Sequence, residues 1–163
     1  MAASPGTGRI GVIVVDHGSR RAESNEMLEE LVRTSIAMRL DHDIVEAAHM
    51  ELAEPSIATA FGRCVDRGAT TVVIQPYFLL PGRHWNIDIP MLAADAAARH
   101  PGVSYLVAAP FGAHPLMAEV VSARVEYCLA RTRGEVPECE ACAGTGVCRL
   151  RTGRPPAAEA AAS

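Results

Sequence analysis

Three side chains suited to metal binding and proton uptake lie just beyond apolar runs of the sequence. They are His17, Glu51 and His84. Two imidazoles and one carboxylate are a usual ligand set for a divalent first-row metal, and histidine accepts protons near neutral pH. A lone histidine after a buried strand is more often a structural hydrogen-bonding group, but three candidates in equivalent places favour a site. We therefore predict a site that binds a metal and takes up substrate protons.

Neighbouring residues widen this chemistry. His49 would share the face of Glu51 in an extended segment, which makes it a weaker candidate ligand. Arg20, Arg21 and Arg83 suit a ligand with several carboxylates, because a guanidinium binds a carboxylate through two parallel hydrogen bonds. Solvated surface charge is the alternative for each arginine. A phosphate site after the first strand is another alternative, but both nucleotide-binding fingerprints, G-x-G-x-x-G and G-x-x-x-x-G-K-[ST], are absent.

The elements that would position these residues show as alternating apolar runs and helical spacings. Apolar runs predict strands at 10–15, 44–48, 72–78 and 105–109. Helical spacing predicts helices at about 23–38, 55–68, 86–100 and 115–131, the last with Leu116, Val120 and Val121 facing inward. Four rounds of strand and helix predict an α/β fold with a doubly wound, four-stranded parallel sheet. Ligands of such sheets bind beyond the carboxyl ends of the strands, where the three candidates fall.

Length and composition argue against several classes of protein. The 163 residues, 49% of them hydrophobic, suit one globular domain. The formal charge of −4 argues against a nucleic-acid partner. No apolar run approaches the roughly 20 residues of a membrane helix, so no membrane partner is expected. The N-terminus lacks the apolar stretch of a secretory signal and is too short for a complete organellar transit peptide, so we expect such a peptide to be absent or incomplete.

A cysteine-rich segment follows the last predicted helix. Cys139, Cys142 and Cys148 form the pattern C-x2-C-x5-C, which favours ligation of a metal or a cluster. A redox pair of Cys139 and Cys142 is the alternative. The predicted organisation is a flexible N-terminus at 1–9, a main domain at 10–133, the cysteine-rich segment at 134–150 and a disordered tail at 151–163.

Three motifs carry a family resemblance. VVDHGSRR, HMELAEPSI and QPYFLLPGRHWNIDIP resemble, in this order, the signatures of the class II chelatases that insert a divalent metal into sirohydrochlorin, a tetrapyrrole with eight carboxylates. The resemblance covers about residues 10–131 and implies a single chelatase lobe. It implies that His17 is the proton acceptor and a metal ligand, that His84 is the second ligand, and that Glu51 contacts substrate or aids metal delivery. The implied substrate pocket consists of Phe78, Leu79, Leu80, Pro81, Gly82 and Arg83.

The resemblance also implies an assembly and a cofactor. Half-size members of this family pair as homodimers, and those of the plant type, which the cysteine-rich tail resembles, carry a [2Fe–2S] cluster and work in the chloroplast stroma. Such a cluster usually has four thiolate ligands, so Cys128 on the last predicted helix would join Cys139, Cys142 and Cys148. A thiol of the other subunit is the alternative fourth ligand, and Cys128 would then be a buried thiol.

The expected function by this resemblance is insertion of Fe²⁺ into sirohydrochlorin to give sirohaem. Insertion of cobalt or nickel is an alternative, because His17 and His84 do not choose among these metals. A non-catalytic carrier of metal or tetrapyrrole, built on the same cleft, is the alternative from another class. No nucleotide cofactor is expected.

Overall fold

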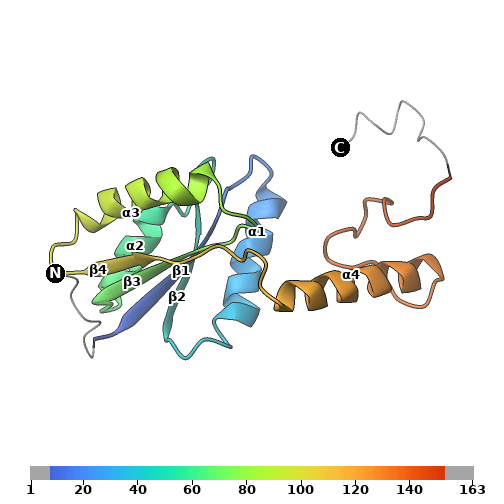
Figure 1. Ribbon diagram of the computed structural model, residues 1–163, viewed down its shortest axis with the longest axis horizontal. Helices are drawn as coiled ribbons and strands as arrows, with labels where there is room; N and C mark the ends of the chain where they lie inside the picture. The colour runs from blue at the N-terminus through green and yellow to red at the C-terminus, as the bar shows by residue number, and fades with distance from the viewer. Residues whose placement is uncertain (1–7, 153–163) are drawn as a thin grey trace. The chain divides into compact units, whose positions relative to one another are not determined.

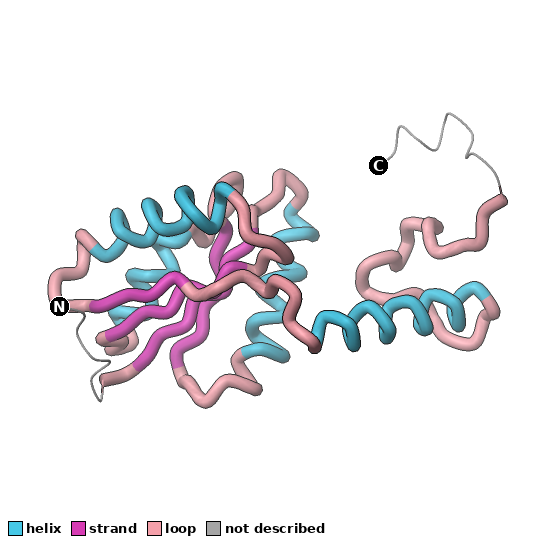
Figure 2. The backbone as a smooth tube through the Cα atoms, viewed as in Figure 1, coloured by secondary structure: helices cyan, strands magenta, loops and turns pink. Residues whose placement is uncertain are grey.

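The structure, a computed structural model, describes residues 8–152 and confirms the predicted four-stranded parallel sheet. Its strands are β1 (Ile10–Asp16), β2 (Ile44–His49), β3 (Thr71–Pro76) and β4 (Ser104–Val107). The strand order is β2-β1-β3-β4, so the chain reverses its direction of winding next to β1 (Figures 1 and 2). The carboxyl ends of β1, β2 and β3 therefore meet at one edge of the sheet. The predicted flexible N-terminus and disordered tail lie almost wholly outside the described residues.

Helices cover both faces of this sheet, as a doubly wound fold requires. The helices of the described chain are α1 (Ala22–Leu31), α2 (Ile57–Asp66), α3 (Ile89–Ala97) and α4 (Leu116–Thr132), with two π-helical segments, η1 (Val32–Ile36) and η2 (His84–Asp88). Helices α2 and α3 lie on one face, and α1 with η1 lies on the other (Figure 1). The fold class predicted from the sequence is confirmed.

Strand β1 is apolar from Ile10 to Val15 because it is buried from both sides. Ile13 and Val15 point to the α2–α3 face, where they join a core that includes Phe61. Val12 and Val14 point to the other face, against Leu28 of α1. Successive side chains of a strand alternate between the faces of its sheet, so a run without polar residues indicates a central strand.

Helix α2 contributes several fully buried side chains to this core. Ser56 caps its N-terminus, where the Ser56 hydroxyl accepts a hydrogen bond from the Thr59 backbone N–H. Ile57, Phe61 and Cys64 are fully buried along one face of the helix. Burial raises the pKa of the Cys64 thiol to about 12. Cys64 is therefore a packing residue.

The segment after β4 forms a compact unit of its own. The chain divides into units at residues 1–113 and 114–163, so α4 belongs with the cysteine-rich segment. The sequence analysis predicted a different boundary, between a main domain at 10–133 and a cysteine-rich segment at 134–150, and that boundary stays a prediction. The expectation that Leu116, Val120 and Val121 face inward is wrong for the described chain, because all three are at least half exposed. Their spacing is that of a helix face that packs, but no described residue of their own unit covers that face.

No helix among the residues that the structure describes is both long and apolar enough to cross a membrane.

Candidate active site

The loops after β1 and β2 are tied together by backbone hydrogen bonds. The Met50 N–H donates to the Asp16 carbonyl (2.9 Å), and the Glu51 N–H donates to the His17 carbonyl (3.1 Å). Gly18 lies against this junction with a φ of +84°, and a Cβ there would be 1.9 Å from the Glu51 carbonyl oxygen. Only glycine allows both the left-handed backbone and this approach. The two loops therefore hold His17 and Glu51 in one register.

His17 and Glu51 are in direct contact at this edge. The His17 Nε2 atom lies 2.9 Å from Glu51 Oε1, and both side chains are about half exposed. The other ring nitrogen, Nδ1, lies 3.1 Å from the Gly18 carbonyl oxygen. Both ring nitrogens thus face oxygen acceptors, so a proton on either nitrogen has a hydrogen-bond partner.

His84 joins this pair from the third loop. Its ring centroid lies 5.2 Å from that of His17, edge to face, and 6.0 Å from that of Phe78. The His84 Nδ1 atom lies 2.8 Å from Asp88 Oδ2, one turn further along the helix. The structure therefore brings His17, Glu51 and His84 together, and their catalytic roles stay predictions.

The beginning of η2 places His84 on a helix rather than in the predicted loop. The Trp85 indole N–H donates to the Ala108 carbonyl (2.9 Å), and the Asn86 N–H donates to the Gly82 carbonyl (2.9 Å). These bonds anchor the first turn, two residues earlier than the helix predicted to begin at about Asn86. Short π-helical turns are frequent at functional sites.

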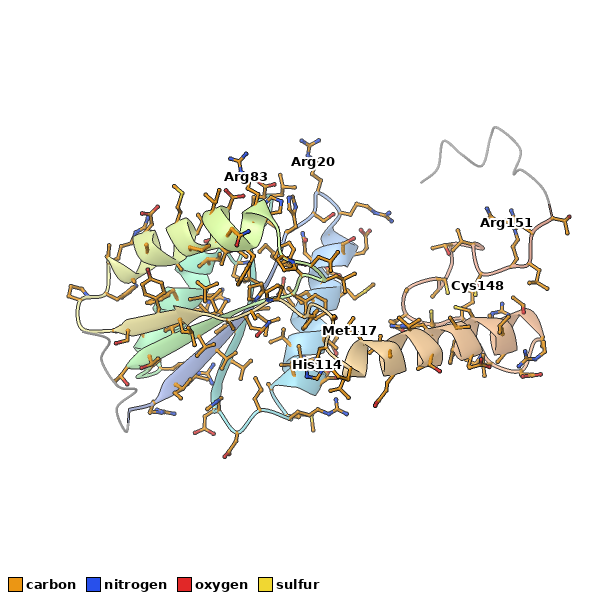
Figure 3. All side chains as sticks on the ribbon, in the orientation of Figure 1. Arg20, Arg83, His114, Met117, Cys148 and Arg151 are labelled. Atoms are coloured by element: carbon orange, nitrogen blue, oxygen red, sulfur yellow. The ribbon has the colours of Figure 1, made fainter. Side chains whose placement is uncertain are left out.

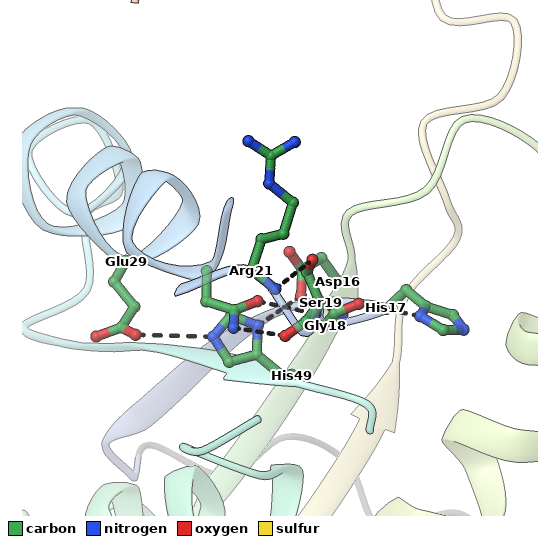
Figure 4. A network of polar contacts seen from close by, with 8 residues as sticks. Asp16, His17, Gly18, Ser19, Arg21, Glu29 and His49 are labelled. Atoms are coloured by element: carbon green, nitrogen blue, oxygen red, sulfur yellow. Dashed lines mark hydrogen bonds and ion pairs between the residues drawn. The ribbon is translucent and has the colours of Figure 1, made fainter. Parts of the chain in front are cut away.

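A buried histidine, His49, contacts the loop that carries His17. His49 is fully buried, its Nδ1 lies 2.6 Å from Asp16 Oδ1, and its Nε2 faces Glu29 at 3.7 Å (Figure 4). Asp16 Oδ1 also accepts the Gly18 N–H at 2.9 Å. The expectation that His49 shares the face of Glu51 is wrong, because β2 ends at His49 and the chain then turns. His49 braces the loop that carries His17 and is not an exposed ligand.

The predicted substrate-pocket residues follow β3 as an exposed loop beside His84. Phe78 packs partly on the core, whereas the next residues, Leu79, Leu80, Pro81, Gly82 and Arg83, are exposed. Backbone bonds from Phe111 to the Phe78 carbonyl (2.9 Å) and from Gly112 to the Leu79 carbonyl (2.7 Å) hold the start of the loop. Arg20 and Arg83 both extend into solvent from this end of the sheet (Figure 3).

Two carboxylates of the site were missed by the sequence analysis. Asp16 precedes His17 and binds His49, and Asp88 binds His84. The spacing of His84 and Asp88, four residues apart in a helical pattern, was a readable signal. No signal in the sequence paired Asp16 with His49, since 33 residues separate them. Within residues 8–152, no three His, Cys, Asp or Glu side chains are already arranged to hold a metal ion, so ligation by His17 and His84 stays a prediction.

The second unit gathers four thiols. The Sγ atoms of Cys139 and Cys142 are 3.1 Å apart. Cys148 hydrogen-bonds to Cys142 and to Cys128 of α4, which is exposed. The alternative that Cys128 is a buried thiol is therefore wrong. All four cysteines outside the core thus lie in one chain of contacts.

The hydrogen bond between Cys139 and Cys142 shifts the pKa values of the two thiols in opposite directions. The bond from Cys142 is the main cause that lowers the pKa of Cys139. The same bond is the main cause that raises the pKa of Cys142, to about 11. Cys139 is therefore the thiol of this pair that ionises first and the stronger nucleophile or metal ligand near neutral pH.

Polar contacts dock the cysteine segment along α4. Arg124 forms an ion pair with Glu140, and the Tyr127 hydroxyl donates to the Pro137 carbonyl at 3.2 Å. Arg131, about two turns further along α4, lies 3.8 Å from Glu138. These contacts bring the C-x2-C pattern back to the helix turn that carries Cys128.

Comparison with known proteins identifies a family and several relatives that resemble this chain. A family model described as CbiX matches residues 11–128. The sirohydrochlorin ferrochelatase of Arabidopsis thaliana, described as chloroplastic, is 55% identical over 140 residues, which are 86% of this chain and 62% of that protein. The chain thus spans less than two thirds of the length of that relative.

Two solved structures share the fold. A CbiX protein from Marinobacter aquaeolei, described as a putative cobalamin biosynthesis protein, is 31% identical with a TM-score of 0.63, over 75% of this chain and 98% of that one. The sirohydrochlorin chelatase SirB from Bacillus subtilis subspecies spizizenii, in complex with cobalt, is 29% identical with a TM-score of 0.66, over 72% of this chain and 50% of that one.

Proposed function

This chain belongs to the CbiX family, and we propose that it is a sirohydrochlorin ferrochelatase, an enzyme that inserts Fe²⁺ into sirohydrochlorin to give sirohaem. One observation carries the proposal: the His17–Glu51 pair, with a 2.9 Å contact, lies beside the His84 ring at the carboxyl edge of the sheet. The site thus combines side chains that can accept a proton with side chains that can bind a metal. The reaction needs both, because the cation replaces two pyrrole protons.

Proton removal is assigned to His17 with Glu51. Sirohydrochlorin must lose two N–H protons when four pyrrole nitrogens take up the cation. His17 accepts a pyrrole proton, and the resulting imidazolium is stabilised by the Glu51 carboxylate at 2.9 Å. The second proton leaves through the same pair once the first has passed to solvent, which reaches both half-exposed side chains.

Metal delivery is assigned to His84 together with His17. Iron is here a substrate that must be bound and then released, and two imidazoles hold it more loosely than a closed four-ligand site would. Glu51 contacts substrate or aids the transfer. The ring centroids of the two histidines lie 5.2 Å apart, so one cation can contact both rings once the His17 ring turns away from Glu51.

The tetrapyrrole is proposed to lie against the loop after β3. Phe78 offers a flat apolar surface, and Leu79, Leu80, Pro81 and Gly82 extend it along the exposed loop. Arg83 would bind a peripheral carboxylate, and Arg20 projects from the same end of the sheet.

We propose that the chain acts as a homodimer. It supplies one lobe, which matches 98% of the Marinobacter protein but 50% of SirB. Helix α4 carries exposed apolar side chains at Leu116, Val120, Val121, Val125 and Leu129. A second copy would cover part of this apolar surface in an isologous dimer. Light scattering tests this: a monomer at micromolar concentration would contradict it.

We propose that Cys128, Cys139, Cys142 and Cys148 hold a [2Fe–2S] cluster. The four thiols already form one chain of contacts, and Cys139 ionises readily, so the donor set fits a thiolate-bound cluster once the sulfur atoms separate. Such a cluster supplies one-electron redox chemistry and a cross-link between the segment and α4. Anaerobic purification with iron and sulfide analysis tests it, and zinc without sulfide would reject it.

Location in the chloroplast stroma is proposed from the Arabidopsis relative, which is described as chloroplastic. Expression of the full-length gene product with a fluorescent tag in plant cells tests this proposal. Signal outside chloroplasts would contradict it.

A single-turnover insertion assay separates the candidate functions. Reduced protein is mixed anaerobically with sirohydrochlorin and Fe²⁺, Co²⁺ or Ni²⁺, and the tetrapyrrole spectrum is followed. The proposal expects the fastest change with Fe²⁺. Faster insertion of Co²⁺ or Ni²⁺ would replace it with the alternative metal, and binding without any spectral change would leave a carrier.

A further inference from the structure

The side chain of Asp88 accepts a hydrogen bond from His84. Asp88 Oδ2 lies 2.8 Å from His84 Nδ1, and the Asp88 side chain is only 28% exposed. A carboxylate only accepts hydrogen bonds, so Nδ1 must carry the hydrogen of this bond. In the neutral ring the lone pair available to a metal is then on Nε2. Among the described residues, no hydrogen bond or ion pair reaches Nε2 of His84.

The ring nitrogens of His17 have different partners from those of His84. Its Nε2 is already in contact with Glu51, and its Nδ1 faces a backbone carbonyl rather than a carboxylate. Of the two rings, only His84 has a carboxylate behind Nδ1 and an unoccupied Nε2 in front.

The Asp88 side chain does not cap a helix. Asp88 is the last residue of η2, has helical backbone angles and leads directly into α3, so no helix begins there. Its two oxygens instead face His84 Nδ1 and, at 3.7 Å, the Nε atom of Arg83. The carboxylate thus contacts the site residue His84 and the neighbouring Arg83.

We propose that Asp88 is a positioning residue that holds His84 in the Nδ1-protonated tautomer and aims the Nε2 lone pair at the incoming metal. Carboxylates behind metal-binding histidines strengthen the imidazole as a ligand, and their removal typically costs about 10- to 100-fold in metal affinity or activity. This inference rests on the proposed function only in taking the metal to be the one that is inserted.

The experiment compares D88A and D88N with D95N, a control on the same helix that removes an exposed carboxylate. Long-range ¹H–¹⁵N spectra report the tautomer of His84, whose signals are assigned by their loss in H84A. Anaerobic titration with Co²⁺ alone reports metal affinity, with H84A as the background. Circular dichroism melting checks that each variant is folded.

We expect His84 to be protonated at Nδ1 in the wild type and in D95N. D88A should lose this preference and bind Co²⁺ about 10- to 100-fold more weakly. D88N should keep the tautomer, because its amide oxygen still accepts the bond, and should lose less affinity than D88A. Should D88A unfold, D88N and the wild-type tautomer still decide the question.

A wild-type tautomer and affinity in folded D88A would overturn the inference, and so would Nε2 protonation in the wild type. Neither measurement uses sirohydrochlorin. A wild type that shows the expected tautomer and Co²⁺ affinity but inserts no metal would therefore contradict the proposed function and leave the inference standing.

Discussion

The carboxyl edge of the sheet and the cysteine segment both gather ionisable side chains, but the chain assembles them differently. His17, Glu51 and His84 come from three loops far apart in the sequence, and backbone bonds between loops hold them. Cys139, Cys142 and Cys148 lie within ten residues of one another and meet one helix of their own unit. The first site depends on the whole sheet, whereas the second depends on a short segment and α4.

The partners of the reactive groups differ as well. At the sheet edge each histidine meets a carboxylate: His17 meets Glu51, and His84 meets Asp88. In the cysteine segment the thiols meet one another, and one thiol gains acidity from its neighbour. If the two regions are independent, a change in one should leave the other intact, and the predictions below test this.

Replacement of His17 should have the largest effect. H17A should slow Fe²⁺ insertion by about 10²- to 10⁴-fold, the usual contribution of a general base, while the iron and sulfide content stays at the wild-type value. Single-turnover absorbance and metal analysis measure the two effects. H42A, which removes a histidine preceding β2, is the control and should insert iron normally. Full activity of H17A would remove its assigned role.

Replacement of Cys139 should show the opposite pattern. C139A should lose nearly all acid-labile sulfide, because the cluster loses the thiolate that forms first. The melting temperature of the sheet unit should not change. The matched control is C64A, which also removes a thiol but should keep the cluster. A wild-type sulfide content in C139A would place the cluster elsewhere.

Replacement of Gly18 tests the rigidity of the sheet edge. G18A should destabilise the protein by about 1–3 kcal/mol, since a residue with a Cβ is strained at a φ of +84° and meets the Glu51 carbonyl. Thermal unfolding should register this as a fall of several degrees. G82A is the matched control, because no atom lies within 4 Å of a Cβ at Gly82. Equal melting temperatures of G18A and G82A would show that the junction between the loops after β1 and β2 is not rigid.

The smallest effect is a difference in thiol reactivity. In reduced, cluster-free protein, iodoacetamide should label Cys139 at a lower pH than Cys142. The pKa of Cys139 is below its ordinary value and that of Cys142 is raised to about 11, so the Cys139 thiolate is populated first as the pH rises. Peptide mass spectrometry over a pH series measures both. Labelling in the reverse order would contradict the hydrogen-bond direction between the two thiols.

Most of the fold could be predicted from the sequence because its signals are local. The β-branched run of β1 and the helical spacing of α2 predicted elements that the structure contains. Right-handed crossovers then leave few topologies for four such units. Helix α4 shows where this reasoning ends: the spacing of Leu116, Val120 and Val121 indicates a packing face, but does not say what covers it.

The sequence by itself determined that His17, Glu51 and His84 would meet, because parallel strands end at the same edge of a sheet. It also determined the C-x2-C-x5-C spacing of the cysteine segment. Only the tertiary structure decided which atom each imidazole nitrogen faces. His49 and Glu51 are two residues apart, yet one is buried against Asp16 and the other reaches His17. The reason is physical: the end of a strand and the turn after it set the direction of each side chain, and contacts across tens of residues decide where that turn falls.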